Sequence, residues 1–331
     1  MFGDRLVNNE DKNILSQTLN DIITLKHPRL SADLIFMPSA SALLSRTRRY
    51  EPYEALDMIR AKLATFITQL SDTSVKAQSV VMLDFALQLV LRVARVLFMA
   101  GGSVLLIGGE GSNKHLCVQI AAALIGHRLH FVHPSNRAAF VDDLKCLYRE
   151  AVVHNKKTTV LMAPDEADDD IALELASSFV CTGEIVSLFS ANEIATIARG
   201  LTGDARRMAN HSVDAHEAAK TLLIERARDN LHFAICIRPG VTLTNFATRF
   251  PALLAECSIQ WVSPWERGSF QLAAEHLLKD VQIDVTVKAS LIQMLIDAHY
   301  AAESITTTQG NGIVTTTPVA FMSLLRRYDD M

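Results

Sequence analysis

SVLLIGGEGSNKH, residues 103–115, joins an apolar run to a glycine-rich turn and then to the start of a helical pattern. Val104–Ile107 is bounded by glycines on both sides, which is typical of a strand buried in a sheet. Lys114–Ile125 has apolar residues three and four positions apart and predicts a helix. Small residues between a strand and a helix let backbone N–H groups turn toward an anion, and the helix N-terminus adds positive potential. The stretch therefore has the context that a phosphate-binding loop requires.

The residues of this loop match the usual phosphate-binding pattern only in part. That pattern is Gly, four residues and then Gly-Lys-Ser/Thr. Gly108 and Lys114 stand at the right spacing, whereas Asn113 replaces the second glycine and His115 replaces the hydroxyl residue. Asparagine tolerates positive φ, so the loop can still close, but His115 cannot supply the hydroxyl that ligates Mg²⁺. Glu110 adds a negative charge, which opposes the binding of a triphosphate.

Two interpretations of the loop follow, and the spacing alone favours neither. In the first, the loop is a nucleotide-binding site. Its binding residues are Gly108, Gly109, Gly111, Ser112, Asn113, Lys114 and His115. In the second, it is only a glycine-rich turn between a strand and a helix, with a surface lysine.

A second apolar run, Thr159–Ala163, leads into Pro164, Asp165 and Glu166. P-loop ATPases place a Mg²⁺-orienting Asp and a water-activating Glu at the end of such a strand, so Asp165 and Glu166 are candidate catalytic residues. The surrounding acids, which include Asp168–Asp170, also allow a simple acidic loop before a helix. Pro164 does not suit a strand end that must place a carboxylate accurately.

Helical and strand patterns alternate over most of the chain. The expected strands are Val104–Ile107, Leu129–Val132, Thr159–Met162 and Phe233–Ile237. The expected helices are Glu54–Leu70, Met82–Phe98, Lys114–Ile125, Phe140–Val153 and Asp168–Phe179, with a long helical region that ends at Asp229. Strands separated by helices of this length predict an α/β fold, in which a parallel sheet has helices on both faces.

The character of the sequence changes near Pro264. Helices are expected after it over Ser269–Leu278, Val285–Ala302 and Pro318–Tyr328, with a polar loop over Thr306–Thr317. The first fifty residues mix short helical signals with loop residues. We therefore expect a lead-in segment over residues 1–50, a large α/β subdomain over 51–265 and a small helical subdomain over 266–331.

Composition excludes several classes of protein. Apolar residues make up 49% of the 331 positions, and glycine and proline only 14 and 9, so the chain is neither disordered nor collagen-like. The net charge is 32 − 36 = −4, which gives no basic field for nucleic acid or an anionic membrane. The most apolar stretch, Val90–Ile107, is interrupted by Arg92, Arg95 and two glycines. It therefore predicts a buried helix and a strand rather than a membrane span.

The cysteines and histidines indicate neither disulfides nor a metal site. Five cysteines lie far apart, at positions 117, 146, 181, 236 and 257, and we expect buried free thiols of a reducing compartment. His127, His130 and His133 are spaced by three, and neighbouring ones on a strand point to opposite faces. No signal-peptide pattern opens the chain. We therefore expect a soluble, cytoplasmic protein without a bound metal.

Several segments resemble the fourth AAA+ module of a dynein heavy chain, most of all the axonemal type. The most specific is Ile224–His232, which reads IERARDNLH. The other similar segments are Phe2–Asn8, Tyr50–Pro52, Val104–Leu116, Asp143–Tyr148, Gly183–Ile185, Leu188–Phe189, Phe250–Pro251, Trp261, Pro264–Trp265 and Thr317–Pro318. The resemblance runs along essentially the whole chain. It implies an AAA+ P-loop fold, in which a parallel sheet flanked by helices precedes a small helical lid.

The resemblance also implies a function. It suggests a regulatory or structural module of an ATP-driven microtubule motor, excised before the coiled-coil stalk, with weak or absent nucleotide binding and hydrolysis. ATP or ADP with Mg²⁺ is the implied ligand. The implied partners are the neighbouring AAA+ modules and, through the stalk of the parent motor, the microtubule, at the cytoskeleton of the axoneme in a cilium or flagellum. The alternatives are an ATPase module that uses Lys114, Asp165 and Glu166, and a stand-alone scaffold, which the end-to-end similarity disfavours.

The sequence departs from the family at each catalytic position. The family keeps a glycine where Asn113 stands, and its strand-end Asp falls on Pro164, so Asp165 is shifted by one residue. Of the arginines that precede the Phe-Pro pair in the family, only Arg249 is kept as an arginine-finger candidate. Arg238 stands where AAA+ modules carry a small polar residue that senses the γ-phosphate. It either contacts phosphate or is a solvated residue at a strand end.

Overall fold

The computed structural model describes residues 8–26, 35–38, 50–53, 63, 83–132, 137–163, 170–185, 188–208, 215–239, 241–279, 281, 284–309 and 316–329. The chain forms two compact units. The first unit comprises residues 1–55, 90–107 and 118–261, and the second comprises residues 56–89, 108–117 and 262–331. The boundaries expected for the lead-in segment and the two subdomains stay predictions.

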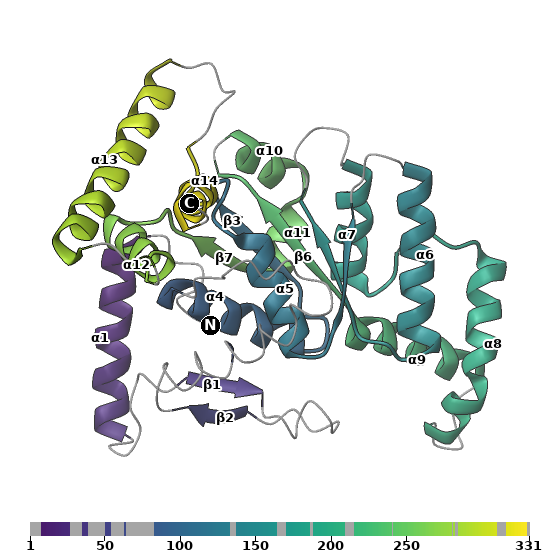
Figure 1. Ribbon diagram of the computed structural model, residues 1–331. Coiled ribbons are helices and arrows are strands. Elements are labelled where there is room, and N and C mark those ends of the chain that lie inside the picture. Colours follow the sequence, from purple (N-terminus) through teal and green to yellow (C-terminus); the bar gives the residue numbers. More distant parts are fainter. Residues whose placement is uncertain are drawn as a thin grey trace. The chain divides into compact units, whose positions relative to one another are not determined.

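A five-stranded sheet forms the centre of the fold, in the order β4-β5-β6-β3-β7 (Figure 1). The strands are β3 (Val104–Gly108), β4 (Arg128–Val132), β5 (Thr158–Met162), β6 (Leu231–Ile237) and β7 (Ser258–Val262). β4, β5, β6 and β3 pair in parallel, with Leu106 opposite Cys236. All residues of β3, β5 and β6 are buried, because both faces of these strands are covered. The prediction of an α/β fold with these four strands is confirmed.

β7 is a strand that is not among the four predicted from the sequence. Its sequence, SIQWV, mixes polar and apolar residues and has no continuous apolar run. Ser258 N–H donates to the carbonyl of Ser103 at 2.9 Å and so joins β7 to the start of β3. The strand is therefore stabilised by its pairing with β3, which no local sequence pattern predicts.

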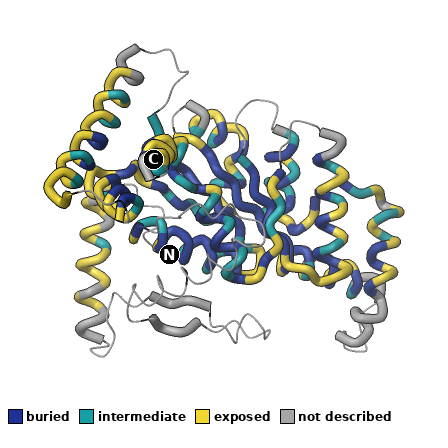
Figure 2. The backbone as a smooth tube through the Cα atoms, viewed as in Figure 1, coloured by how far each residue is buried: buried dark blue, intermediate teal, exposed yellow. Residues whose placement is uncertain are grey.

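Helices pack on the sheet and supply most of the core of the first unit. They are α6 (Arg137–Val153), α7 (Asp170–Thr182), α8 (Ala191–Met208), α9 (Ala215–Asn230), α10 (Val241–Arg249) and α11 (Pro251–Glu256). The long helical region expected up to Asp229 consists of two helices, α8 and α9, which are packed against each other. In the core, the ring of Phe179 lies 5.4 Å from that of Phe233 and 6.4 Å from that of Tyr148. Figure 2 shows the buried residues concentrated along the strands.

Two further helices flank the glycine-rich loop in the sequence, and the N-terminal region adds three elements. The flanking helices are α4 (Asp84–Phe98) and α5 (Lys114–Leu124), both as expected. The N-terminal elements are α1 (Asn9–Lys26) and an antiparallel pair, β1 (Ile35–Pro38) and β2 (Tyr50–Tyr53). The expectation of only short helical segments was wrong for α1, which has 18 residues. The helix expected over residues 54–70 lies outside the described residues, apart from position 63.

The second unit has its own aromatic core, built by the C-terminal helices. These are α12 (Arg267–Leu277), α13 (Val285–Gln309) and α14 (Pro318–Asp329). Phe270 is central, because its ring lies 5.3 Å from Trp265 and 5.0 Å from Phe321. The three predicted helices are confirmed. α13 ends at Gln309 rather than Ala302, so the loop expected from Thr306 begins as helix.

All five cysteines are free, but they are not all buried. Cys117, Cys236 and Cys257 are buried, whereas Cys146 and Cys181 are exposed, so the expectation of five buried thiols was wrong for these two. Burial raises the pKa of Cys117 to about 12, which makes it a core residue and a poor nucleophile. Among the described helices, none has the length and apolar character of a membrane span.

Candidate phosphate-binding site

The glycine-rich loop connects the buried strand β3 to helix α5, as predicted. Two of its residues have left-handed backbone, Gly111 with φ 65° and Asn113 with φ 59°. Asn113 therefore takes the conformation that the usual glycine would take, and the prediction that asparagine lets the loop close is confirmed. Cys117 N–H donates to the carbonyl of Asn113 at 3.0 Å, which begins the helix. The phosphate-loop backbone is thus formed despite the missing glycine.

Several N–H groups of the loop are available to an anion. Within the part of the chain that the structure describes, the N–H groups of Gly109, Gly111, Ser112 and Asn113 have no acceptor. The side chain of Ser112 instead donates to the carbonyl of Gly109 at 2.8 Å and tightens the turn. Unpaired N–H groups in a left-handed turn, followed by a helix N-terminus, form a concave site of positive potential. The loop therefore has the geometry to bind a phosphate.

Lys114 is buried, with 7% of its surface exposed, and its ammonium group turns back onto the loop. Nζ donates to the carbonyl of Gly108 and to that of Gly109, the latter at 3.0 Å. This arrangement does not match the surface lysine of the second interpretation of the loop. A phosphate entering the loop would compete with these carbonyls for the ammonium group.

Packing requires glycine at position 108. A Cβ atom added there would come within 2.7 Å of the Cβ of Val262 in β7.

Glu110 and His115 are both exposed. His115 offers only an imidazole at the start of α5, so the hydroxyl ligand for Mg²⁺ is missing there.

Of the remaining predicted site residues, the structure describes some and leaves others undescribed. Asp165 and Glu166, with Pro164, lie outside the described residues, so their catalytic roles stay predictions. Arg238 follows β6 directly, and Ile237 of β6 is paired with Ile107 of β3. Arg238 is exposed, and its role toward a phosphate stays a prediction.

Arg249 ends helix α10 and is exposed. Its guanidinium carbon lies 5.7 Å from the ring centroid of Phe250, which is buried, and Pro251 then begins α11. The contact fixes the stem of Arg249 beside the Phe-Pro pair. Its role as an arginine finger stays a prediction.

Of the three histidines spaced by three, His127 is buried and His130 is partly exposed. His133 lies outside the described residues, and no group of three metal-binding side chains occurs among the residues described. His127 stacks on His232 with ring centroids 4.9 Å apart, and its Nδ1 lies 3.1 Å from Thr159 Oγ1. Burial lowers the pKa of His127 to about 2, with repulsion from His232 and Lys157 adding to the effect. His127 is therefore a neutral, packed side chain.

Sequence reasoning missed one residue at the loop. A Cβ atom added to Gly111 would come within 2.4 Å of the Cβ of Thr317, the residue that precedes α14. The Thr-Pro pair at the start of α14 is visible in the sequence as a helix start, but nothing local relates it to the loop.

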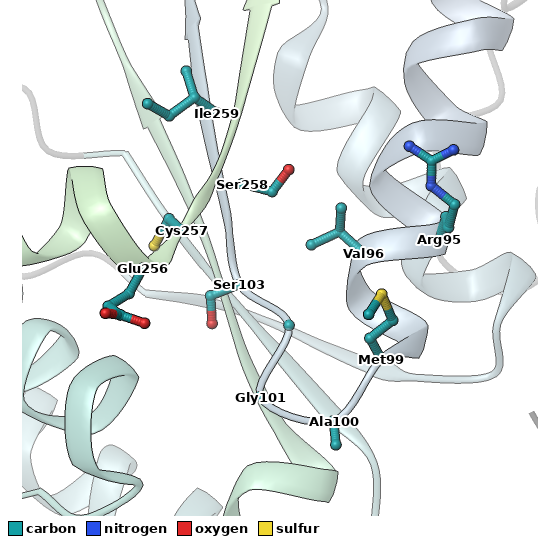
Figure 3. Close-up of a pocket in the computed structure, with 11 residues that line it drawn as sticks. Arg95, Val96, Met99, Ala100, Gly101, Ser103, Glu256, Cys257, Ser258 and Ile259 are labelled. Carbon is teal, nitrogen blue, oxygen red and sulfur yellow. The ribbon is translucent and has the colours of Figure 1, made fainter. Parts of the chain in front are cut away.

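A cavity of about 300 Å³ lies at the other end of β3 (Figure 3). It is bounded by the end of α4, the Gly101–Gly102 turn and the residues that begin β7. Figure 3 shows its two charged side chains, Arg95 and Glu256, on opposite sides. The hydroxyl of Ser103 already accepts from Phe233 N–H at 3.3 Å. The cavity is lined by residues that come before β3 and at the start of β7, whereas the predicted site follows β3. The two are therefore separate.

Comparison with known proteins agrees with this geometry. The profile of one family, described as "P-loop containing dynein motor region D4", matches residues 78–331. Dynein axonemal heavy chain 5 of Mus musculus is 29% identical over 254 residues, which are 74% of this chain and 6% of that protein. Dynein axonemal heavy chain 2 of Mus musculus is 25% identical over 312 residues, or 91% of this chain and 7% of that protein.

A relative from Chlamydomonas reinhardtii matches almost the whole chain. The Dynein-1-alpha heavy chain of the flagellar inner arm I1 complex of Chlamydomonas reinhardtii is 22% identical over 347 aligned residues, which cover 99% of this chain. The match covers only 7% of that relative, so the chain spans a small part of the heavy chains that it resembles. With the α/β sheet, the loop and the family match together, the chain belongs to the dynein heavy chain family, as its P-loop containing AAA+ motor region D4.

Proposed function

We propose that this chain is a regulatory or structural AAA+ module of a dynein heavy chain, with weak or absent nucleotide binding and hydrolysis. The observation that carries the proposal is the state of the loop. Among the described residues, the N–H groups of Gly109 and Gly111 have no acceptor, but Lys114 is held by the loop's own carbonyls. Because residue 115 is a histidine, the position that usually ligates Mg²⁺ has no hydroxyl group.

The chemistry of these groups explains why affinity would be low. The ammonium group of Lys114 must give up charge-assisted hydrogen bonds to reach a phosphate, and each of these is stronger than a neutral hydrogen bond. The carboxylate of Glu110 repels a triphosphate at the mouth of the loop. Mg²⁺, which normally neutralises this charge, would have one protein ligand fewer.

The alternative function is an ATP-binding and hydrolysing module that uses Lys114, Asp165 and Glu166. The N–H groups of Gly109 and Gly111, which have no acceptor in the part of the chain that the structure describes, favour it, because such groups hold phosphate in P-loop proteins. The ligand in either case would be ATP or ADP, with Mg²⁺.

Calorimetric titration of the chain with ATP and Mg²⁺ separates the two functions. We expect binding weaker than micromolar, or none, and no release of phosphate. Micromolar binding together with turnover would reject the proposal in favour of the ATPase. Lys114→Ala is the control for heat that arises elsewhere, because a signal that persists in this variant does not come from the loop.

The family supports a proposal for the role of the module. The relatives are named as axonemal dynein heavy chains, and we propose that this chain also belongs to an ATP-driven microtubule motor of the axoneme, in a cilium or flagellum. Its partners would be the neighbouring AAA+ modules of the same heavy chain and, through the stalk of the parent motor, the microtubule. Association of the full heavy chain with isolated axonemes, released by ATP, would test this assignment.

A further inference from the structure

The tip of the phosphate loop lies against the start of the last helix. A Cβ atom added to Gly111 would be 2.4 Å from Thr317 Cβ, 2.9 Å from its Oγ1 and 3.2 Å from its Cγ2. Real side chains do not approach so closely, so Thr317 occupies the space that any residue other than glycine would need at the loop tip. Gly111 thus has two reasons to be glycine, its φ of 65° and this neighbour.

Two hydrogen bonds join Thr317 to the first turn of α14. Its Oγ1 accepts a hydrogen bond from Ala320 N–H at 3.2 Å, and its carbonyl accepts one from Phe321 N–H at 3.1 Å. Thr317 is therefore the N-cap of α14. Phe321 and Leu325 of the same helix are 2% and 0% exposed, in the aromatic core of the second unit. A shift of Thr317 requires the first turn of α14 to shift or fray.

We infer that Thr317 is a positioning residue of the phosphate loop, which holds the loop tip at Gly111 and links its conformation to α14. The inference rests on the proposed anion site, because it assigns Thr317 a role in shaping it. The N–H groups of Gly111 and Ser112 point toward an anion only while the loop keeps its left-handed turn. A fixed side chain beside Gly111 narrows the set of conformations that the tip can take, and thereby pre-organises the turn.

The contact can be tested without any ligand, by a double-variant cycle on Gly111 and Thr317. Gly111→Ala introduces both backbone strain and the collision with Thr317. Thr317→Gly removes the collision together with the hydrogen bond from Ala320 N–H to Oγ1, at a cost of only a few tenths of a kcal/mol because glycine is tolerated at the N-cap. The effect of Gly111→Ala is therefore compared within each background. We expect Gly111→Ala to accelerate amide exchange in the first turn of α14 by about tenfold in the wild-type background. In the Thr317→Gly background the same substitution should change exchange there by less than threefold.

Gly109→Ala is the matched control in the same loop. A Cβ atom at Gly109 meets nothing within 4 Å, so this variant should leave exchange in α14 unchanged. Equal effects of Gly111→Ala in the two backgrounds would overturn the inference, because they would mean that only the φ angle of Gly111 matters. A similar change in α14 with Gly109→Ala would overturn it too, since any added side chain in the loop would then suffice.

Titration with inorganic pyrophosphate supplies the functional measurement. If the loop binds it, Thr317→Gly should weaken binding at least threefold, whereas Ser323→Gly, a variant further along α14, should not. Equal losses in both variants would show a general effect of α14 stability and overturn the positioning role. If wild type binds neither pyrophosphate nor ATP, the anion site fails and the positioning role fails with it, while the exchange cycle still decides whether Thr317 and Gly111 are coupled.

Discussion

Strand β3 has a glycine turn at each end, and the two turns use their backbone in opposite ways. Before the strand, Gly101 N–H donates to the carbonyl of Arg228 at 2.7 Å and Gly102 N–H to that of Met99 at 3.0 Å. The carbonyl of Gly102 lies 2.8 Å from His232 Nδ1. After the strand, the N–H groups of Gly109 and Gly111 find no acceptor in the described part of the chain.

Both turns contain a glycine with φ 65°, so the left-handed backbone alone does not distinguish them. The N–H groups of the first turn donate to other parts of the chain, whereas those of Gly109 and Gly111 in the second turn have no acceptor among the described residues. Glycines therefore indicate a tight turn in both cases. Whether the N–H groups of such a turn have acceptors within the protein decides whether they can still bind an anion. Five predictions test this difference. The first four come in order of decreasing effect, and the last concerns hydrolysis.

The largest effect should come from Gly102→Ala in the structural turn. The added Cβ would lie 1.9 Å from the carbonyl oxygen of Val96, a backbone atom that cannot move alone. We expect a loss of about 3 kcal/mol in the free energy of unfolding, measured by urea titration. Gly109→Ala, where the Cβ meets nothing within 4 Å, should change it by less than about 0.5 kcal/mol. Equal losses would mean that the two turns are packed alike.

Lys114→Ala should have the next largest effect, on the binding turn. It removes the fixed positive charge of the loop, so any affinity for ATP should fall at least 30-fold, or about 2 kcal/mol. Calorimetric titration measures it, with Lys279→Ala as a control at an exposed lysine. Unchanged affinity in Lys114→Ala would show that nucleotide binds elsewhere.

The structural turn should also be sensitive to acid, through the histidine pair beside it. His127 has its pKa lowered to about 2 in the folded chain, chiefly by burial, so it stays neutral when folded but is protonated in the unfolded chain below about pH 6.5. Stability from this group is complete above that pH and is lost as pH falls. At pH 5 the loss should be about 2 kcal/mol. Urea titrations at pH 7 and pH 5 measure it, and in His127→Gln the difference should shrink by that amount.

The smallest effect should come from repair of the binding turn. Glu110→Gly removes the anion at the loop and should raise ATP affinity by about threefold to tenfold, since solvent screens an exposed charge. Asn113→Gly should add less, because Asn113 already has φ 59°. His115→Thr restores the hydroxyl for Mg²⁺. Glu110→Gln separates charge from backbone freedom, and a gain with Gly but not Gln would contradict the electrostatic reason.

Hydrolysis should remain poor in the triple variant Glu110→Gly, Asn113→Gly, His115→Thr. Pro164 still shifts Asp165 and Glu166 by one position relative to the family. Phosphate release under saturating ATP measures it. Rapid turnover would show that the shifted pair is competent and that the loop alone was limiting.

Much of the fold was predictable, because its elements have local causes. Strands such as β3 and β6 are continuous apolar runs buried on both faces, and the C-terminal helices have clear apolar spacing. β7 and α1 were not predictable in this way. β7 is held by pairing with β3, and α1 carries few apolar residues and leaves Ile14 60% exposed. The exposed positions of Cys146 and Cys181 were missed because residue type does not reveal which side of a helix faces solvent.

The sequence by itself determined that a strand, a glycine-rich turn and a helix follow one another at residues 104–124, and that the turn lacks the usual hydroxyl. Those properties depend on neighbours in the chain. Only the tertiary structure decided that the N–H groups of Gly109 and Gly111 have no acceptor among the described residues, that Lys114 turns back onto two carbonyls and that Thr317 lies against Gly111. Hydrogen bonds and close contacts depend on which distant segments meet, and the packing of α14 brings Thr317 to the loop from the far end of the sequence.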